Sequence, residues 1–92
     1  MTAPAQRQIT ACLTALFGAD VVALLDTPAK RTAAYRICRL LAASRDGAEV
    51  ARAWMVGMNP RLDHHEPITA IAAGCAGEVE AAARAYLDGS AP

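Results

Sequence analysis

Alanine outnumbers every other residue in this 92-residue chain, and that bias limits the folds the chain can adopt. Alanine has the highest helix propensity of the common residues, whereas the strand-favouring Val, Ile and Thr show little clustering here. The chain holds only one Phe, one Trp and two Tyr, so its core must consist mostly of small and aliphatic side chains. The sequence therefore predicts an all-α protein, a compact bundle of about five to six short helices.

The spacing of apolar residues predicts two helices at the N-terminal end. The first runs from Pro4 or Ala5 to about Phe17, because its apolar residues recur three and four positions apart and Gly18 follows. Its expected inward face is Ile9, Cys12, Leu13, Leu16 and Phe17. A short second helix over residues 19–25 is expected to bury Val21, Val22, Leu24 and Leu25.

The longest predicted helix begins at Pro28 and continues to Ser44. Thr27 can cap its first turn, and Pro28 suits the first helical position because its missing N–H costs nothing there. The expected inward residues are Ala33, Ile37, Leu40 and Leu41. On the opposite side lie Arg31, Tyr35 and Arg39, with Arg36 beside them.

A further helix is predicted to begin at the stretch DGAE, residues 46–49, which is typical of a capping box. Its expected inward residues are Val50, Ala51, Trp54 and Met55. Pro60 is expected to end this helix, because proline restricts the backbone of Asn59 before it. Residues 59–66 then form a polar loop, exposed from Arg61 onward.

Two short helices are predicted to close the chain. Pro67 begins the first, which carries Ile68, Ile71 and Ala72 and ends at Gly74. The second spans about residues 77–87 and stops at Gly89, with Val79, Ala82, Ala83, Tyr86 and Leu87 inward. No apolar run approaches the roughly 18 residues of a membrane span and no signal peptide is evident, so a soluble cytoplasmic protein is expected.

Charge is segregated along the chain, although the net charge is zero. Residues 1–45 carry six basic and two acidic residues, a balance of +4, whereas residues 46–92 carry three basic and seven acidic residues, a balance of −4. This division predicts two surfaces with different partners. We therefore expect an N-terminal helical region over residues 1–45 and a C-terminal binding region over residues 46–92.

Little in the sequence favours catalysis, a metal or a cofactor. His64 and His65 are adjacent, and neighbouring histidines on one loop usually point apart, so a solvated loop is favoured over a zinc site. Cys12, Cys38 and Cys75 are odd in number and far apart, which favours buried free thiols over disulfides or metal ligands. No oxyanion-hole motif or phosphate-binding glycine loop accompanies them. The chain is therefore predicted not to be an enzyme.

The stretch ADVVALLDTPAKRTAAYR, residues 19–36, has the order of a helix-turn-helix. A short apolar helix is followed by a tight turn and by a second helix with basic residues, whose guanidinium groups can contact bases and phosphates. The DNA-binding candidates are Lys30, Arg31, Arg36 and Arg39. A solvated helix face is the alternative interpretation of the same residues.

A more specific pattern runs through residues 53–89, AWMVGMNPRLDHHEPITAIAAGCAGEVEAAARAYLDG. A Trp, an Asn-Pro pair, a short loop, a Pro that opens a helix, a Gly and a final helix ending at Gly follow in order. The residues are Trp54, Asn59, Pro60, Leu62, Pro67, Ile71, Gly74, Val79 and Gly89. This pattern resembles the C-terminal toxin-binding domain of the Xre/MbcA/ParS antitoxins over about residues 38–90.

The resemblance implies a partner, a RES-domain toxin that degrades NAD, whose active-site entrance the antitoxin covers to keep substrate out. It also implies an N-terminal helix-turn-helix that dimerises and represses the promoter of the pair. About 37 residues precede the match, fewer than a complete Xre domain uses. Two interpretations therefore stay open, a shortened DNA-binding unit over residues 19–39 or the loss of operator binding. Family habit and the small core predict a homo-oligomer.

Within this pattern, structural and toxin-binding roles can be separated. Trp54 is expected to anchor the core beneath the loop with its indole N–H hydrogen-bonded, while Asn59 and Pro60 turn the chain. The toxin-binding candidates are Arg61, His64, His65, Glu78, Glu80 and Asp88. The carboxylates among them can meet the basic rim of a pocket that binds a pyrophosphate. For the loop residues, toxin contact and simple solvation are equally weighted.

Two other functions fit the same sequence. One is a stand-alone, prophage-type helix-turn-helix regulator whose C-terminal half only dimerises, for which steep salt dependence of DNA binding would be diagnostic. The other is an orphan adaptor that binds an unrelated host protein. A RES-type reading frame beside the gene would favour the antitoxin over the adaptor.

Overall fold

The computed structural model describes residues 4–43 and 47–89, and these residues form six α-helices and one short 3₁₀ helix without a β-strand. The elements in chain order are α1 (Gln6–Phe17), α2 (Ala19–Leu24), α3 (Pro28–Ala42), α4 (Gly47–Val56), η1 (Pro60–Leu62), α5 (Pro67–Ala72) and α6 (Ala76–Leu87). The predicted all-α bundle of short helices is therefore confirmed. In the described ranges, no helix combines the length and apolar character needed to cross a membrane.

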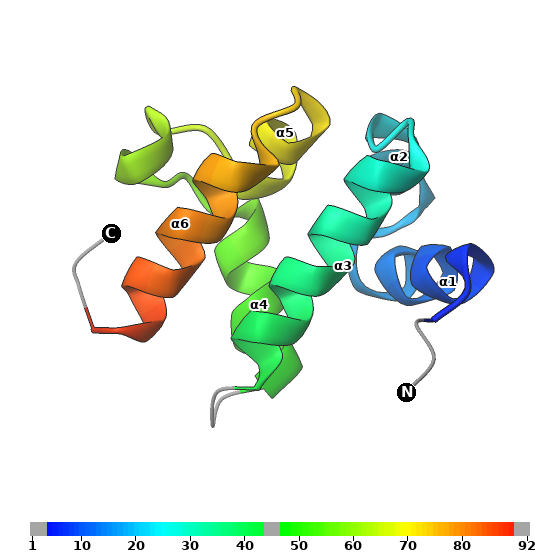
Figure 1. The fold of residues 1–92 in the computed structure, drawn as a ribbon, viewed down its shortest axis with the longest axis horizontal. Coiled ribbons are helices and arrows are strands. Elements are labelled where there is room, and N and C mark those ends of the chain that lie inside the picture. The colour runs from blue at the N-terminus through cyan, green and yellow to red at the C-terminus, as the bar shows by residue number, and fades with distance from the viewer. Residues whose placement is uncertain (1–3, 44–46, 90–92) are drawn as a thin grey trace.

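Helix α3 lies at the centre of the fold. It has α1 on one side and α4 and α6 on the other, and it also contacts α5 (Figure 1). Its buried residues are Ala33, Ala34, Ile37, Cys38 and Leu41. Because the distance between packed helices depends on the side chains at their contact, the alanines of α3 allow its neighbours to approach closely.

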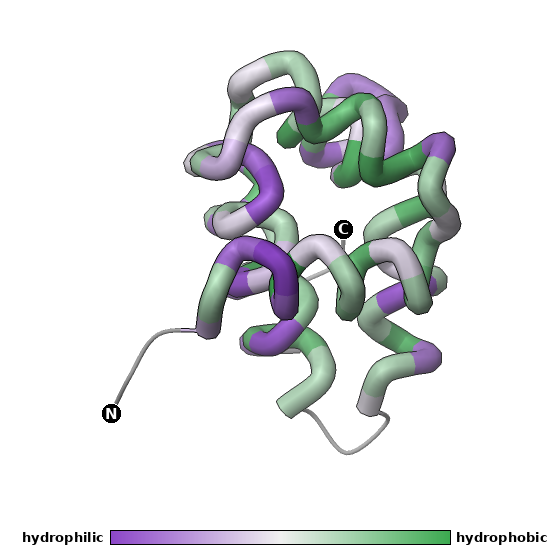
Figure 2. Tube along the Cα trace, turned by 90° about the vertical axis from the view of Figure 1, so that its right-hand side faces the viewer, coloured by the Kyte–Doolittle hydropathy of each residue, from purple (hydrophilic) through white to green (hydrophobic). Residues whose placement is uncertain are grey.

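One hydrophobic core joins the two halves of the chain that differ in charge. Leu13 and Leu25 from the first half and Met55, Ile71 and Val79 from the second are all fully buried. Figure 2 shows hydrophobic and hydrophilic segments alternating along the helices, as expected for helices with one face in a core. The predicted boundary near residue 45 therefore separates two regions of charge whose apolar residues pack together.

Several helix boundaries follow the start and stop signals in the sequence. Thr27 Oγ1 accepts a hydrogen bond from the backbone N–H of Lys30 at 3.2 Å, and Pro28 occupies the first position of α3. Gly18 ends α1 with a φ of 88°, and Gly89 follows α6 with a φ of 86°. Glycine adopts this left-handed region without a steric penalty, which makes it a common helix terminator. These predicted caps and stops are confirmed.

Two predicted helix ends have different outcomes. Helix α3 ends at Ala42, while its predicted end at Ser44 and the first residue of the capping box lie outside the described residues. Helix α4 ends at Val56, so the prediction that Pro60 ends it is wrong, and Pro60 instead begins η1. Gly57 follows Val56 directly, and its low helix propensity accounts for the earlier end.

Three residues predicted to point inward are exposed instead. Leu24 and Leu87 are 53% and 37% exposed, and Cys12 is also exposed. Leu24 and Leu87 are the last residues of α2 and α6, where no further helical turn covers them. On α1, Leu13 takes the buried position and leaves Cys12 on the flank of the helix.

Two leucines of contrasting burial provide a matched test of this core. Leu41 is fully buried in α3, whereas Leu24 is 53% exposed. We expect Leu41→Ala to lower the free energy of unfolding by about 2–5 kcal/mol, because it removes buried methyl groups and leaves a cavity. Leu24→Ala should change it by no more than about 0.5 kcal/mol. Chemical denaturation measures both, and equal losses for the two variants would contradict the packing described here.

Candidate functional site

The Asn-Pro pair forms a tight turn that is held together by Asn59. This side chain is only 4% exposed, and its Oδ1 accepts a hydrogen bond from the backbone N–H of Arg61 at 2.9 Å. The Asn59 carbonyl accepts from the backbone N–H groups of Leu62 and His64, each at 2.9 Å, and its own N–H donates to the His65 carbonyl at 3.2 Å. Asn59 therefore fixes every residue from Arg61 to His65 except Asp63 by a direct hydrogen bond.

This turn holds the following residues in an unusual backbone conformation. Asp63 and His64 have φ values of 55° and 64°, in the left-handed region that non-glycine residues seldom adopt. Leu62 is buried, so the prediction of a wholly exposed loop from Arg61 onward is wrong at that position. The leucine side chain enters the core and anchors η1, while the polar residues around it remain exposed.

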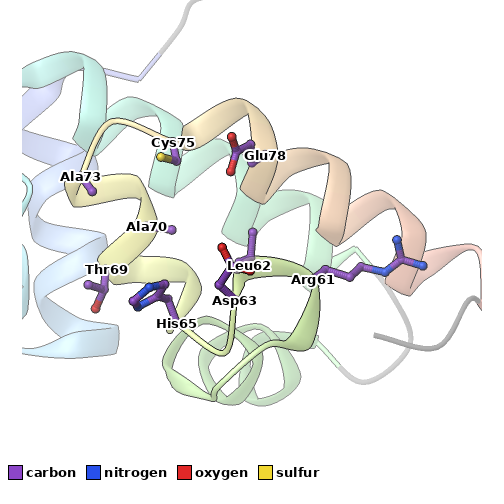
Figure 3. Close-up of a pocket in the computed structure, with 9 residues that line it drawn as sticks. All are labelled: Arg61, Leu62, Asp63, His65, Thr69, Ala70, Ala73, Cys75 and Glu78. Atoms are coloured by element: carbon purple, nitrogen blue, oxygen red, sulfur yellow. The ribbon is translucent and has the colours of Figure 1, made fainter.

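A cavity of about 280 Å³ lies between this turn, α5 and the start of α6 (Figure 3). Its lining residues are Arg61, Leu62, Asp63, His65, Thr69, Ala70, Ala73, Cys75 and Glu78. Three of the predicted toxin-binding residues, Arg61, His65 and Glu78, are thus brought together by the fold. The side chain of Arg61 extends away from the other labelled residues, so the acidic and neutral groups dominate the opening.

Two carboxylates line this cavity from different elements. Asp63 follows η1, and Glu78 lies in the first turn of α6. Neither makes an ion pair with any residue in the described part of the chain. Thr69 Oγ1 donates to Glu66 Oε1 at 3.2 Å beside the cavity. This cavity, called the acidic cavity below, therefore carries two carboxylates that have no ion-pair partner among the described residues.

Residues that could hold a metal do not gather here. Among the residues that the structure describes, no group of three or more His, Cys, Asp or Glu is placed to bind a metal ion. His64 and His65 are both exposed, and only His65 lines the cavity. The described part of the site is therefore a hydrogen-bonded turn beside a small cavity.

Glu80 and Asp88, the other two acidic candidates, lie outside the cavity. Glu80 accepts hydrogen bonds from Arg36 Nη2 at 3.0 Å and from Arg84 Nη2 at 3.3 Å. These two arginines lower the pKa of Glu80, the bond from Arg36 contributing most. Asp88 is exposed just beyond the C-terminal end of α6. Glu80 therefore joins α6 to α3, instead of facing outward with Glu78.

The DNA-binding candidates on α3 differ in the contacts that they make. Lys30 Nζ pairs with Asp26 Oδ1 at 2.9 Å, and the hydrogen bond from Lys30 lowers the pKa of that carboxyl. Arg31 Nη1 donates to the Leu25 carbonyl at 2.8 Å, which ties the turn before α3 to the helix. Arg39 instead lies over the Tyr35 ring, 5.9 Å from its centroid.

These contacts leave only part of the predicted basic face available to DNA. Arg36 and Arg39 remain exposed, whereas Lys30 and Arg31 are half-buried. Helix α3 also contacts α1, α4, α5 and α6, and its buried side chains begin at Ala33.

The other motif residues have structural positions. Pro67 is buried at the start of α5, and Gly74 adopts a φ of 96° after it. Trp54 packs against Tyr86 with ring centroids 6.2 Å apart, but its buried indole N–H has no acceptor among the described residues, contrary to expectation. No family model, curated protein or solved structure matches this chain, so the family resemblance stays a prediction.

Asp63, Thr69 and Cys75 were absent from the sequence-based candidates. A left-handed turn at Asp63 has no reliable sequence signal in a non-glycine residue. Thr69 and Cys75 reach the cavity only through the packing of α5 against α6. The one available signal was the position of Asp63 within the Asn-Pro loop.

The Asn59 turn can be tested without touching the cavity residues. We expect Asn59→Ala to lower the free energy of unfolding by about 0.5–2 kcal/mol, because the variant loses the acceptor that caps η1. Protection of the Arg61 amide from hydrogen exchange should fall as well. Met58→Ala, at a neighbouring residue that is 78% exposed, is the matched control. Unchanged protection in Asn59→Ala would show that the turn does not depend on this side chain.

The Glu80 ion pairs predict a pH dependence of stability. The pKa of Glu80 in the folded protein lies below its ordinary value of 4.5, so the pairs stabilise the fold above about pH 4.5. That contribution is lost as the pH falls through the lowered pKa. Glu80→Gln should therefore reduce the loss of stability on acidification in urea unfolding experiments. Asp88→Asn, which removes an exposed carboxylate, should keep the original profile, and identical profiles for all three proteins would contradict the assignment.

Proposed function

We propose that this chain is the antitoxin of a type II toxin–antitoxin pair and that it binds and occludes a RES-domain toxin that degrades NAD. The ordered Trp, Asn-Pro, Pro and Gly residues support this family assignment. The observation that supports it most is that Arg61, His65 and Glu78 all line one cavity beside the Asn59 turn. Candidates chosen for toxin contact are thereby neighbours in space.

The lining of the cavity suits contact with a side chain of a protein partner. Its volume of about 280 Å³ lies near the lower end for ligand pockets, which span roughly 300–1,000 Å³. A single side chain of a partner fits such a space. Leu62, Ala70 and Ala73 offer apolar contact, and Asp63 and Glu78 supply charge at the opening.

The negative charge of this surface favours a partner with a basic surface. A toxin that binds NAD must attract a pyrophosphate, so the rim of its pocket is expected to be basic. The carboxylates of Asp63 and Glu78 complement such a rim and would accelerate association by attraction over distance. Glu80 contributes less, because Arg36 and Arg84 already neutralise it.

The rigid turn also favours tight binding. Ordering a flexible loop at an interface costs conformational entropy, whereas the hydrogen bonds of Asn59 hold residues 61–65 before any partner arrives. Binding through a preformed surface suits an inhibitor that acts by occlusion, because the inhibitor itself undergoes no chemical step.

The charge model predicts a change in the association rate. Asp63→Asn combined with Glu78→Gln should slow association with the co-encoded RES-domain protein by roughly 3- to 10-fold at low ionic strength, with less effect at high salt. Surface plasmon resonance with purified proteins measures this rate. Glu49→Gln is the matched control, because Glu49 lies in the first turn of α4, at the opposite end of the molecule from η1 and α5 (Figure 1).

Growth of cells that express the toxin provides the functional measurement. Co-expression of this chain should preserve growth and cellular NAD. Failure to protect, with both proteins soluble, would reject the antitoxin function. Protection with an unchanged association rate in the double variant would keep that function and reject the role of this cavity.

A further inference from the structure

A second cavity lies where α1, α3 and α4 meet, and it shares no lining residue with the acidic cavity. It measures about 200 Å³ and is lined by apolar atoms. Its lining residues are Cys12, Leu16, Tyr35, Cys38, Arg39, Ala42, Ala48 and Ala51. Two of the three cysteines of the chain therefore share one cavity, although 25 residues separate them in the sequence.

The two cysteines differ in their access to solvent. Cys12 on α1 is exposed, whereas Cys38 on α3 is 5% exposed. Burial, and to a smaller extent the nearby Cys12, raise the pKa of the Cys38 thiol to about 12. Cys12 can therefore meet a water-borne reagent first, while Cys38 stays protonated beside it. The third cysteine, Cys75, lies in the other cavity.

We propose that Cys12 and Cys38 form an oxidative modification site, at which a peroxide converts the two thiols into a disulfide that links α1 to α3. The pair combines an accessible first thiol with a neighbouring second thiol, which is the arrangement of a redox-sensing cysteine and its resolving partner. In compartments that keep thiols reduced, such disulfides are transient and regulatory.

The chemistry requires only hydrogen peroxide as oxidant. The Cys12 thiol first releases its proton to solvent, and its thiolate attacks one peroxide oxygen; the O–O bond breaks and hydroxide leaves, giving a sulfenic acid. The Cys38 sulfur then attacks the Cys12 sulfur as it loses its proton, and the S–O bond breaks. The departing hydroxide and the released proton form water. In sum, two thiols and one peroxide give one disulfide and two waters, with the sulfurs oxidised and the peroxide reduced.

The position of α1 gives this link a mechanical effect. Helix α1 packs mainly on α2 and α3, and Arg52 Nε of α4 donates to its Leu16 carbonyl at 3.0 Å. A covalent bond to the central helix would hold α1 in place when these contacts open. This site shares no residue with the acidic cavity, so the proposal does not depend on the proposed function.

Mass spectrometry of the whole protein tests the pair. The reduced protein is treated with a few equivalents of hydrogen peroxide. One portion is measured intact, and the other is blocked with an alkylating reagent and digested. We expect a mass lower by two hydrogens, a cross-linked peptide pair containing Cys12 and Cys38, and full reversal by dithiothreitol. Cys75→Ser should behave as the wild type. Cys12→Ser should lose the cross-link, and Cys38→Ala should leave a sulfenic acid on Cys12 that dimedone traps.

Three results would overturn the proposal. One is a wild-type protein in which Cys12 proceeds to sulfinic acid without a cross-link, since that would show that Cys38 cannot reach it. Another is a cross-link that persists in Cys12→Ser. The third is a disulfide that joins two copies of the chain, detected as a dimer on non-reducing gels.

Discussion

Close packing against helix α3 holds the other helices of this fold together. Ala33 and Ala34 are both buried on a helix that contacts four others, and their small side chains allow these contacts at short distance. Ile37 and Leu41 fill the space between the helices. Because the chain has few aromatic residues, its core consists mostly of alanine and aliphatic side chains. Helix α3 packs against residues of both the basic and the acidic half.

The acidic cavity depends on that packing through α5 and α6. Both helices contact α3, and η1 contacts α6, so the turn after Asn59 is held against a fixed support. The buried side chain of Leu62 anchors the turn in the core, and the hydrogen bonds of Asn59 determine the backbone shape of the turn. Asp63 and Glu78 are thereby placed on one opening, although 15 positions separate them in the sequence.

Sequence patterns predicted the elements of this fold better than the contacts between them. The cap at Thr27 and the stop at Gly18 follow from local chemistry, and both are confirmed. The bond between Arg36 and Glu80 spans 44 positions and joins residues that sequence analysis assigned to different partners. Periodicity within one helix contains no information about which face of another helix it meets.

Sequence analysis predicted only part of the candidate site, because local patterns do not determine contacts between helices. Asn59 and Pro60 were identified correctly as the residues that turn the chain, because their side-chain capping and fixed φ act locally. The exposure of Cys12 depends on tertiary neighbours and was predicted wrongly. The same holds for the Trp54 indole N–H, which has no acceptor among the residues that the structure describes. The left-handed Asp63, which completes the acidic opening, depends on the whole turn.

Capture of the natural partner is the strongest test of the antitoxin proposal. The tagged chain would be isolated from its native host, and the bound proteins identified by mass spectrometry, in parallel with a chain that carries Asp63→Asn and Glu78→Gln. We expect a RES-domain protein as the main partner of the unmodified chain and less of it with the variant. Recovery of only the chain itself, of DNA, or of an unrelated host protein would contradict it.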